Sequence, residues 1–388
     1  MFAALVICPD EALLAAILRL AQQTGQVLVA KTLDHYPVPY ELERLLSTGA
    51  PDVLFVELTD AVAAIGVARQ TRRVSPATAT VGVGGNWERE TAGYREATGI
   101  CALLPVPLSE GAFRDSLRRA VHAVSGDLQR GLFAFLPAKA GTGATVTALH
   151  VAGCLAEPLG RRVVLIEADL RSGVLQAVTH ASPESEIQTV LANPGSLTRA
   201  QWLRFVARKH GVDLLLTNRL WKGPAPVWIG YHHLLEFVAA EYDFALVDLP
   251  ELVNDATKEV VRRAQCVSVV TTPELPALDL ARQRSAELLE RGVGRDRIQL
   301  IVTRWQNSDP GPEYFEKLLG HTVAATLPSD YPSLCKAIQA GELVPSSKAL
   351  GKAYLALAKA IAGIEDPAPP ASVLARARSG LGALIGSW

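Results

Sequence analysis

The residues with the clearest chemical potential lie in a glycine-containing segment near the middle of the chain, FAFLPAKAGTGATVTAL at 133–149. Gly141 and Gly143 stand two positions apart, and Thr145 supplies a hydroxyl group just after them. Glycines at this spacing let backbone N–H groups converge on an anion, and a hydroxyl at the start of a following helix suits a magnesium ion. The segment therefore predicts a loop that binds the phosphates of a nucleotide.

This loop departs at two positions from the usual pattern of a phosphate-binding loop, G-x-x-x-x-G-K-[ST]. Ala138 takes the place of the first glycine and Ala144 the place of the lysine, while Lys139 lies five residues before Ala144. Two other interpretations stay open here. One is an ordinary glycine turn with a solvated lysine. The other is a dinucleotide fingerprint, with Glu167 placed for a ribose contact but Val146 where the third glycine belongs.

Two carboxylates follow apolar segments of strand type. Asp248 ends the segment YDFALVD at 242–248, and Asp169 comes soon after RVVLI at 162–166. A carboxylate at the carboxyl end of a strand beside the loop can hold Mg²⁺ through water. Asp248 and Thr145 therefore form the predicted metal pair.

The elements that must position these residues alternate between strands and helices. This alternation predicts an α/β protein with two doubly wound parallel sheets. The expected domains are residues 1–126 and 131–363, separated by a linker at 125–127 and followed by a Pro-rich linker and tail at 364–388. Within the second domain, we expect helices at 198–209, 234–240 and 337–344 and an irregular segment at 221–230.

Composition limits the functional classes. The chain has 388 residues, of which 49% are apolar and 20% charged, as expected for a folded protein. The formal net charge of −1 gives no general attraction to nucleic acid. Five cysteines without a C-x-x-C pair favour a reducing compartment over zinc or iron–sulfur binding. No apolar run reaches the ~18 residues of a membrane span, and residues 1–9 predict a first strand instead of a signal peptide. We therefore expect a cytoplasmic protein.

Taken in order, the motifs resemble those of the MinD/ParA family of P-loop ATPases. Lys139 ahead of G-x-G-x-T matches the family's deviant loop, whose early lysine reaches the partner's phosphates across a dimer. Asp169 matches the second acid of a D-x-D motif beside the γ-phosphate and attacking water, whereas Glu167 departs from the first. Thr303 and Arg304 stand where the family usually has an Asn–Arg pair that reads adenine.

The resemblance implies ATP and Mg²⁺ as cofactors and a homodimer as the working form. The implied catalytic residues are Lys139 and Asp169, and the implied metal residues are Thr145 and Asp248. The implied nucleotide-binding residues are Lys139, Ala140, Gly141, Thr142, Gly143, Ala144, Thr145, Val146, Thr303, Arg304, Pro328 and Asp330.

The first 126 residues resemble a response-regulator receiver domain in size and element order. Receivers accept a phosphate on an Asp at the end of the third strand, where this chain has Glu57. The receiver's acidic pair is reduced to Asp10 and Glu11, and Val106 stands at the lysine position. The resemblance therefore implies a degenerate receiver used for protein contacts. An unrelated flavodoxin-like domain remains the alternative.

Both domains together resemble the TadZ/CpaE group of pilus assembly proteins, in which the loop lysine at the Ala144 position is often lost while the early lysine stays. This implies an ATP-binding localisation and assembly factor for a tight-adherence (Tad) pilus secretion machine, with slow ATP hydrolysis. The machine's other components are the implied partners, and the cell pole or inner membrane face is the implied location. A ParA-type DNA-partitioning ATPase is the alternative, although no specific nucleic acid is expected.

The last residues, 372–388, combine Arg376 and Arg378 with several apolar side chains. A basic amphipathic tail of this kind suits peripheral contact with a membrane surface. Glycines weaken its helix by roughly 1 kcal/mol each, so a frayed terminus is an equal alternative.

Overall fold

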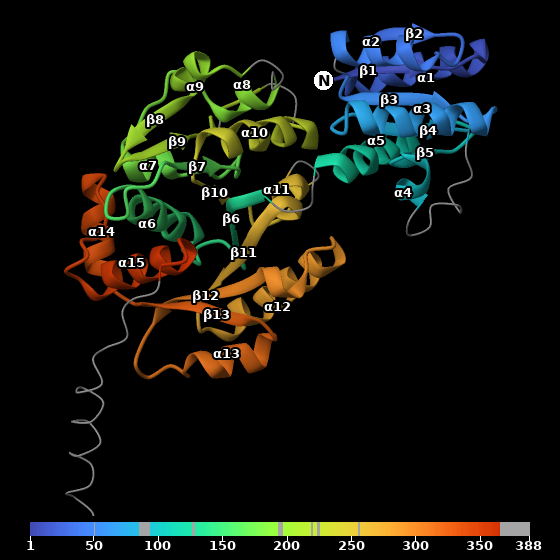
Figure 1. Ribbon diagram of the computed structural model, residues 1–388. Coiled ribbons are helices and arrows are strands. Elements are labelled where there is room, and N and C mark those ends of the chain that lie inside the picture. Colours follow the sequence, from blue (N-terminus) through green and yellow to red (C-terminus); the bar gives the residue numbers. More distant parts are fainter. Residues whose placement is uncertain are drawn as a thin grey trace, which may run out of the picture.

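The computed structural model describes residues 1–49, 51–84, 94–125, 129–192, 197–218, 220–222, 226–254 and 257–364. These residues form two α/β units, each built on its own sheet (Figure 1). Residues 126–127 of the expected linker at 125–127, and residues 365–388 of the expected Pro-rich linker and tail at 364–388, lie outside the described residues. Among the described helices, none is both long and apolar enough to cross a membrane.

The N-terminal unit is a five-stranded parallel sheet in the order β2-β1-β3-β4-β5, with helices on both faces. Its strands are β1 (Phe2–Ile7), β2 (Val27–Leu33), β3 (Val53–Glu57), β4 (Ala79–Val83) and β5 (Ala102–Leu104). Its helices are α1 (Glu11–Thr24), α2 (Pro39–Gly49), α3 (Ala61–Val74), α4 (Tyr94–Thr98) and α5 (Glu110–Ser125). Every residue of β3 is buried, as a continuous apolar run in a central parallel strand requires. The order 2-1-3-4-5 is that of flavodoxin and of the receiver protein CheY.

The second unit is an eight-stranded sheet in the order β13-β12-β11-β6-β10-β7-β9-β8. Its strands are β6 (Gln129–Pro137), β7 (Val163–Glu167), β8 (Val206–Lys209), β9 (Val212–Leu215), β10 (Phe244–Asp248), β11 (Ala264–Thr271), β12 (Ile298–Trp305) and β13 (Thr322–Pro328). Only β8 runs antiparallel to its neighbour among the strand pairs described. The expected doubly wound parallel architecture is thus confirmed, with one antiparallel edge strand.

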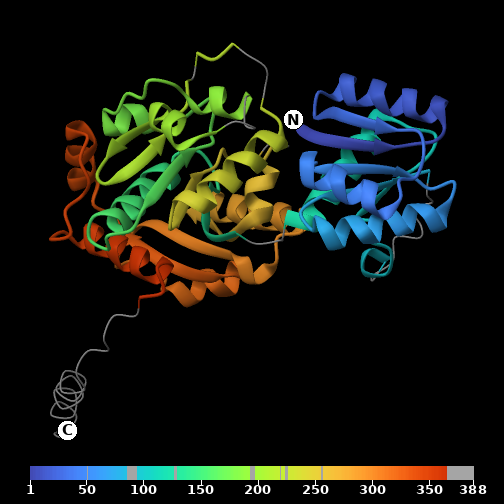
Figure 2. The same cartoon turned by 45° about the horizontal axis from the view of Figure 1, so that its top comes forward.

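Helices cover both faces of this sheet (Figures 1 and 2). They are α6 (Ala144–Ala156), α7 (Leu175–Thr179), α8 (Ile187–Ala192), α9 (Arg199–Phe205), α10 (Trp228–Glu241), α11 (Lys258–Arg263), α12 (Leu275–Glu290), α13 (Pro312–Leu319), α14 (Tyr331–Ala340) and α15 (Ala349–Ile361). One apolar cluster joins α6 and α15 to the sheet, and a second joins α10, α11 and α12 to it. Strand β6 lies between β11 and β10, so the loop that follows it emerges near the middle of the sheet's carboxyl edge.

Three of the expected helices were wrong in extent. The helix expected at 198–209 ends at Phe205, and β8 follows, because His210 and Gly211 form a two-residue hairpin turn with φ of 51° and 72°. Helix α10 begins at Trp228, inside the segment expected to be irregular. The helix expected at 337–344 is α14 (Tyr331–Ala340). It is ended by Gly341, whose backbone is in the left-handed conformation.

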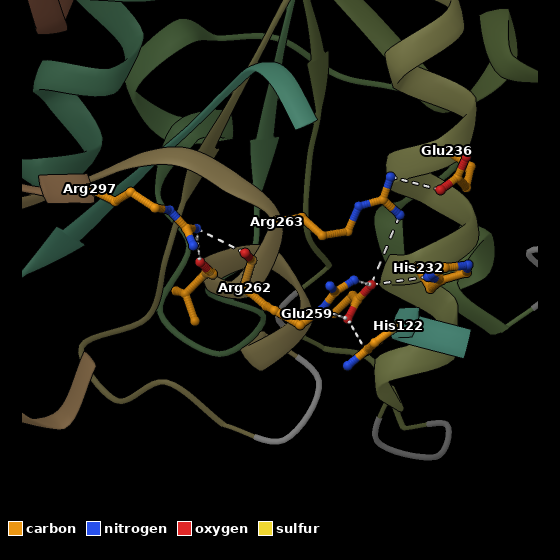
Figure 3. Close-up of polar contacts among 8 residues, drawn as sticks. His122, His232, Glu236, Glu259, Arg262, Arg263 and Arg297 are labelled. Atoms are coloured by element: carbon orange, nitrogen blue, oxygen red, sulfur yellow. Dashed lines mark hydrogen bonds and ion pairs between the residues drawn. The ribbon is translucent and has the colours of Figure 1, made fainter. Parts of the chain in front are cut away.

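The two units meet where α10 begins. Trp228 and Ile229 belong to the apolar cluster of the N-terminal unit, and the rings of Trp228 and Phe2 lie 5.7 Å apart. Next to them, His122 Nε2 of α5 lies 2.8 Å from Glu259 Oε2 of α11 (Figure 3). The Trp228 contact therefore connects an apolar core in one unit to a helix of the other.

Glu259 is the centre of the polar part of this junction (Figure 3). It is 2% exposed and also lies within 3.0 Å of His232 Nδ1 and of Arg262 Nη2. Burial acts to raise the pKa of Glu259, but the hydrogen bonds from His122, His232 and Arg262 outweigh it and hold the pKa below its usual value. A buried carboxylate with this many partners makes a specific contact between the units.

Candidate nucleotide-binding site

The glycine loop lies between β6 and α6, as the sequence predicts. Gly141 and Gly143 have φ of 83° and 88°, a left-handed conformation that glycine adopts without steric cost. No side chain caps the N-terminus of α6, so its first backbone N–H groups remain available to a ligand. These amides and the partial positive charge of the helix N-terminus suit phosphate oxygens.

The loop borders a cavity of about 2200 Å³ at the carboxyl edge of the sheet. The loop contributes Ala140 to Thr147 to its lining, and Asp169, Leu249, Pro250 and Glu251 line it on the β10 and β7 side. On the β12 and β13 side, the lining residues are Thr303, Arg304 and Leu327 to Tyr331. The cavity thus brings together most of the residues that the sequence predicted to bind a nucleotide.

Ala144 and Lys139 differ in charge and in their position relative to the cavity, as the resemblance to the deviant loop implies. Ala144 is 4% exposed and packs in the apolar cluster around α6, so the loop holds no cation at that position. Lys139 is half-buried and is not among the cavity's lining residues. Within the described part of the chain, its ammonium group has no ion-pair partner. The Lys139 charge is therefore not committed to the cavity of its own chain.

Thr145 and Asp248 meet beside the loop as the predicted metal pair. The two side chains are close enough for Thr145 to act on the pKa of the Asp248 carboxyl group, and Asp248 is 2% exposed. Oδ1 of Asp248 has no hydrogen-bond partner among the described residues. Burial raises the pKa of Asp248 to about 8, with the nearby Thr145 hydroxyl acting in the opposite direction. A buried oxygen without a partner, next to a hydroxyl group, fits a hard divalent cation.

Glu167 is the last residue of β7 and Asp169 lies just beyond it, and the two acids have different roles. Asp169 lines the cavity, and its Oδ1 accepts the N–H groups of Arg171 at 3.2 Å and Ser172 at 2.9 Å. Glu167 is 1% exposed and accepts the N–H groups of Leu175 at 2.7 Å and Thr217 at 2.9 Å. Glu167 is therefore a buried structural carboxylate engaged by backbone amides, an arrangement that does not favour the dinucleotide interpretation.

The residues expected on the base side line the cavity, and two of them also contact the loop. Thr303 is 7% exposed, and its hydroxyl lies 2.7 Å from the carbonyl oxygen of Thr142 and 3.1 Å from that of Thr271. Arg304 has φ of 54° and donates to the carbonyl oxygen of Gly141 at 2.6 Å. Asp330 caps α14 by accepting the N–H group of Ser333. The bonds of Thr303 and Arg304 fix the shape of the loop, and the Thr303 hydroxyl proton is already engaged by two carbonyl oxygens.

Two residues at the cavity were missed by sequence reasoning. Glu251 follows Asp248 by three residues, and its carboxylate accepts the N–H group of Ala140 at 3.1 Å. Tyr231 is fully buried on α10, and its hydroxyl finds no partner among the described residues. Glu251 lies just after a strand end, and this position could have marked it as a site residue. Tyr231 gave none, because it lies between the segment expected to be irregular, 221–230, and the expected helix at 234–240.

Comparison with known proteins gives a consistent assignment for the second unit. No family model matches the chain. The sequence is 25% identical over 249 residues to the septum site-determining protein MinD of Synechocystis sp., covering 59% of this chain and 88% of that protein. It is 26% identical over 181 residues to a putative tyrosine-protein kinase EpsB of Ralstonia solanacearum, covering 46% of this chain and 24% of that protein.

Two solved structures have a similar fold. A ParA family ATPase from Chlorobium tepidum matches with a TM-score of 0.52 and 20% identity, covering 59% of this chain and 98% of that one. The MinC:MinD cell division complex of Aquifex aeolicus gives a TM-score of 0.52 and 20% identity, with 61% and 98% covered. The loop, the Thr145–Asp248 pair and the eight-stranded sheet all belong to the second unit. These matches, which cover 59% and 61% of the chain, show that this part of it has the fold of the MinD/ParA-type P-loop ATPases.

Proposed function

We propose that the protein is an ATP- and Mg²⁺-binding, dimeric switch that acts as a localisation and assembly factor for a Tad pilus secretion machine. The observation that carries this proposal is the pairing of an uncapped phosphate loop with Asp248, a buried carboxylate that has an unpartnered oxygen. That pairing supports nucleotide binding with a metal ion, and the fold supports a MinD/ParA-like use of it.

The chain's own residues would have separate roles in binding the nucleotide and in its hydrolysis. The loop N–H groups from Gly141 to Thr145 would hold the phosphates, and Thr145 and Asp248 would hold Mg²⁺. Bound Mg²⁺ neutralises charge on the terminal phosphates. Asp169 would face the attacking water. Ala144 supplies no charge to the transition state, so hydrolysis should be slow.

Dimer formation follows from the unused charge of Lys139. Two chains that face each other under twofold symmetry would each place this lysine in the partner's site. ATP would then stabilise the dimer because its γ-phosphate contacts the partner's lysine, a contact that ADP lacks.

The pilus role rests on the order of the two units. The N-terminal unit has the receiver strand order, and its Glu57 stands at the end of β3. We propose domains at 1–126 and 131–363, the first a degenerate receiver that contacts other components of the machine. The tail at 364–388 would supply a peripheral membrane contact.

A genetic experiment tests this role. Deleting the gene from its host should remove Tad pili from the cell surface, and a fluorescent fusion should mark the cell pole. Complementation with the Asp248→Asn variant should restore the protein level but not the pili. Normal piliation in the deletion strain would contradict the pilus role. A salt-sensitive shift of plain duplex DNA by the purified protein would favour the DNA-partitioning alternative instead.

A further inference from the structure

Glu251 connects the phosphate loop to a buried arginine. Its Oε2 accepts the backbone N–H group of Ala140 at 3.1 Å, and its Oε1 lies 3.3 Å from Arg284 Nη2 on α12. Arg284 is 5% exposed, whereas the Glu251 side chain is 38% exposed and lines the cavity. The carboxylate thus holds a loop amide that would otherwise be open to an anion.

The sheet order shows which end of a bound nucleotide this carboxylate would meet. Strands β12 and β13, with Thr303 and Pro328, lie on one side of β6, and β10 lies on the other. Asp248 of the metal pair ends β10, and Glu251 follows it by three residues. Glu251 reaches from there to Arg284 of α12, the helix that packs on β11 on the other side of β6. A magnesium ion held by Thr145 and Asp248 would neutralise charge on the terminal phosphates of a bound nucleotide, so these phosphates would lie near Ala140 and Glu251.

We propose that Glu251 is a resident anion at the γ-phosphate end of the loop and sets the balance between ATP and ADP. This inference rests on the proposed function, nucleotide binding at this loop. A γ-phosphate and the Glu251 carboxylate carry like charge and compete for the same amide donor of Ala140. ATP must therefore displace the carboxylate, while ADP, which is shorter by one phosphate, leaves it in place.

The surroundings allow this displacement. Arg284 also pairs with Glu287, at 2.7 Å, so it keeps a counter-ion when Glu251 moves. No buried charge is then left alone, which is the condition under which breaking an ion pair is strongly unfavourable. Glu251 is exposed enough to turn into solvent.

The test compares ATP and ADP affinities of the full chain by titration calorimetry with Mg²⁺. Glu251→Gln keeps the shape and removes the charge, and Glu287→Gln is the matched control because it removes the other carboxylate on Arg284. We expect Glu251→Gln to tighten ATP binding about tenfold while ADP binding changes less than about twofold. Glu287→Gln should leave the ratio of the two affinities unchanged.

A merely structural role for Glu251 would shift both nucleotides equally, so an unchanged ratio in Glu251→Gln overturns the inference. The same ratio change in Glu287→Gln would overturn it too, since the effect would then come from Arg284. If neither nucleotide binds the natural protein or either variant, the proposed function itself fails. If both bind with an unchanged ratio, the proposed function stands and the role of Glu251 falls.

Discussion

Two carboxylates end central strands in the two units, and their surroundings are opposite. Glu57 ends β3 in the N-terminal unit and is 4% exposed. Its oxygens accept the N–H group of Asp10 at 3.0 Å, the hydroxyl of Thr59 and the thiol of Cys8 at 3.4 Å. Burial, and then the bond to Glu57, raises the pKa of Cys8 to about 12, which keeps that thiol a donor. The site at Glu57 is therefore complete without a ligand.

Asp248 ends β10 at an equivalent place in the second unit but keeps an oxygen without a partner among the described residues. The fold places an acid at the carboxyl edge in both units, and local hydrogen bonds decide what each acid does. A buried acid whose oxygens are all satisfied stabilises its loop. One with an unpartnered oxygen is prepared for a cation.

The largest expected effect comes from removing the acid with the unpartnered oxygen. Asp248→Ala should weaken Mg²⁺-dependent ATP binding by at least about 100-fold, because the metal loses its buried ligand. Titration calorimetry with and without Mg²⁺ measures this. Glu57→Ala is the matched control at the other strand end, and its ATP affinity should equal that of the natural protein. Equal losses in both variants would end the distinction between the two sites.

The raised pKa of Asp248 predicts a pH dependence of stability without Mg²⁺. The usual pKa is 3.8 and burial raises it to about 8, so the folded chain keeps a proton that the unfolded chain releases in this interval. The stabilisation from this group is therefore present at low pH and is lost as the pH rises toward about 8, by up to about 1 kcal/mol per pH unit. Urea unfolding at pH 5 to 8 measures the slope. Asp248→Asn should flatten it, and the same slope in that variant would contradict the assignment.

A third prediction concerns the closed site. Glu57→Gln replaces an acceptor oxygen by an amide nitrogen, so the Thr59 hydroxyl or the Asp10 N–H group loses its acceptor. We expect the free energy of unfolding to fall by about 1–3 kcal/mol. Denaturant unfolding followed by circular dichroism measures this, with Thr59→Val as a smaller perturbation of the same contact. A variant as stable as the natural protein would show that these bonds contribute nothing.

The smallest expected effect is a gain in ATP affinity from a substitution in the phosphate loop. Ala144→Lys restores a point charge at the start of α6, and we expect ATP to bind about tenfold more tightly. Ala144→Met, which adds length without charge, is the control and should not tighten binding. Because Ala144 is buried, thermal unfolding should accompany the titration to show that both variants fold. Equal affinities for the lysine and methionine variants would refute an electrostatic effect.

The glycine loop and the place of Asp248 at a strand end could be predicted from the sequence because both depend on short-range patterns. Gly141 and Gly143 need left-handed backbone, and Asp248 ends an apolar strand. The contacts of Thr303 and Glu251 could not be predicted, because they join the loop to segments more than 100 residues away. Only the folded sheet brings these residues together.

The bounds of two helices could not be predicted because contacts with other segments decide where they begin and end. Prolines and glycines before Trp228 hid the start of α10, although Trp228 is fixed by packing on Phe2 of the other unit. Apolar residues continue past Phe205 at helical spacing, but the His210–Gly211 turn pairs that stretch with β9. In both places, tertiary contacts outweighed the local pattern.

The central claim, an ATP-dependent dimer held by Lys139, is tested most directly by light scattering of the full chain with ATP, with ADP and without nucleotide, each with Mg²⁺. Lys139→Ala is measured beside Lys317→Ala, which removes an exposed lysine of α13. We predict the largest dimer fraction for the natural protein with ATP, a clear loss of it in Lys139→Ala and no change in Lys317→Ala. A dimer fraction that responds to neither nucleotide nor Lys139→Ala would contradict the switch.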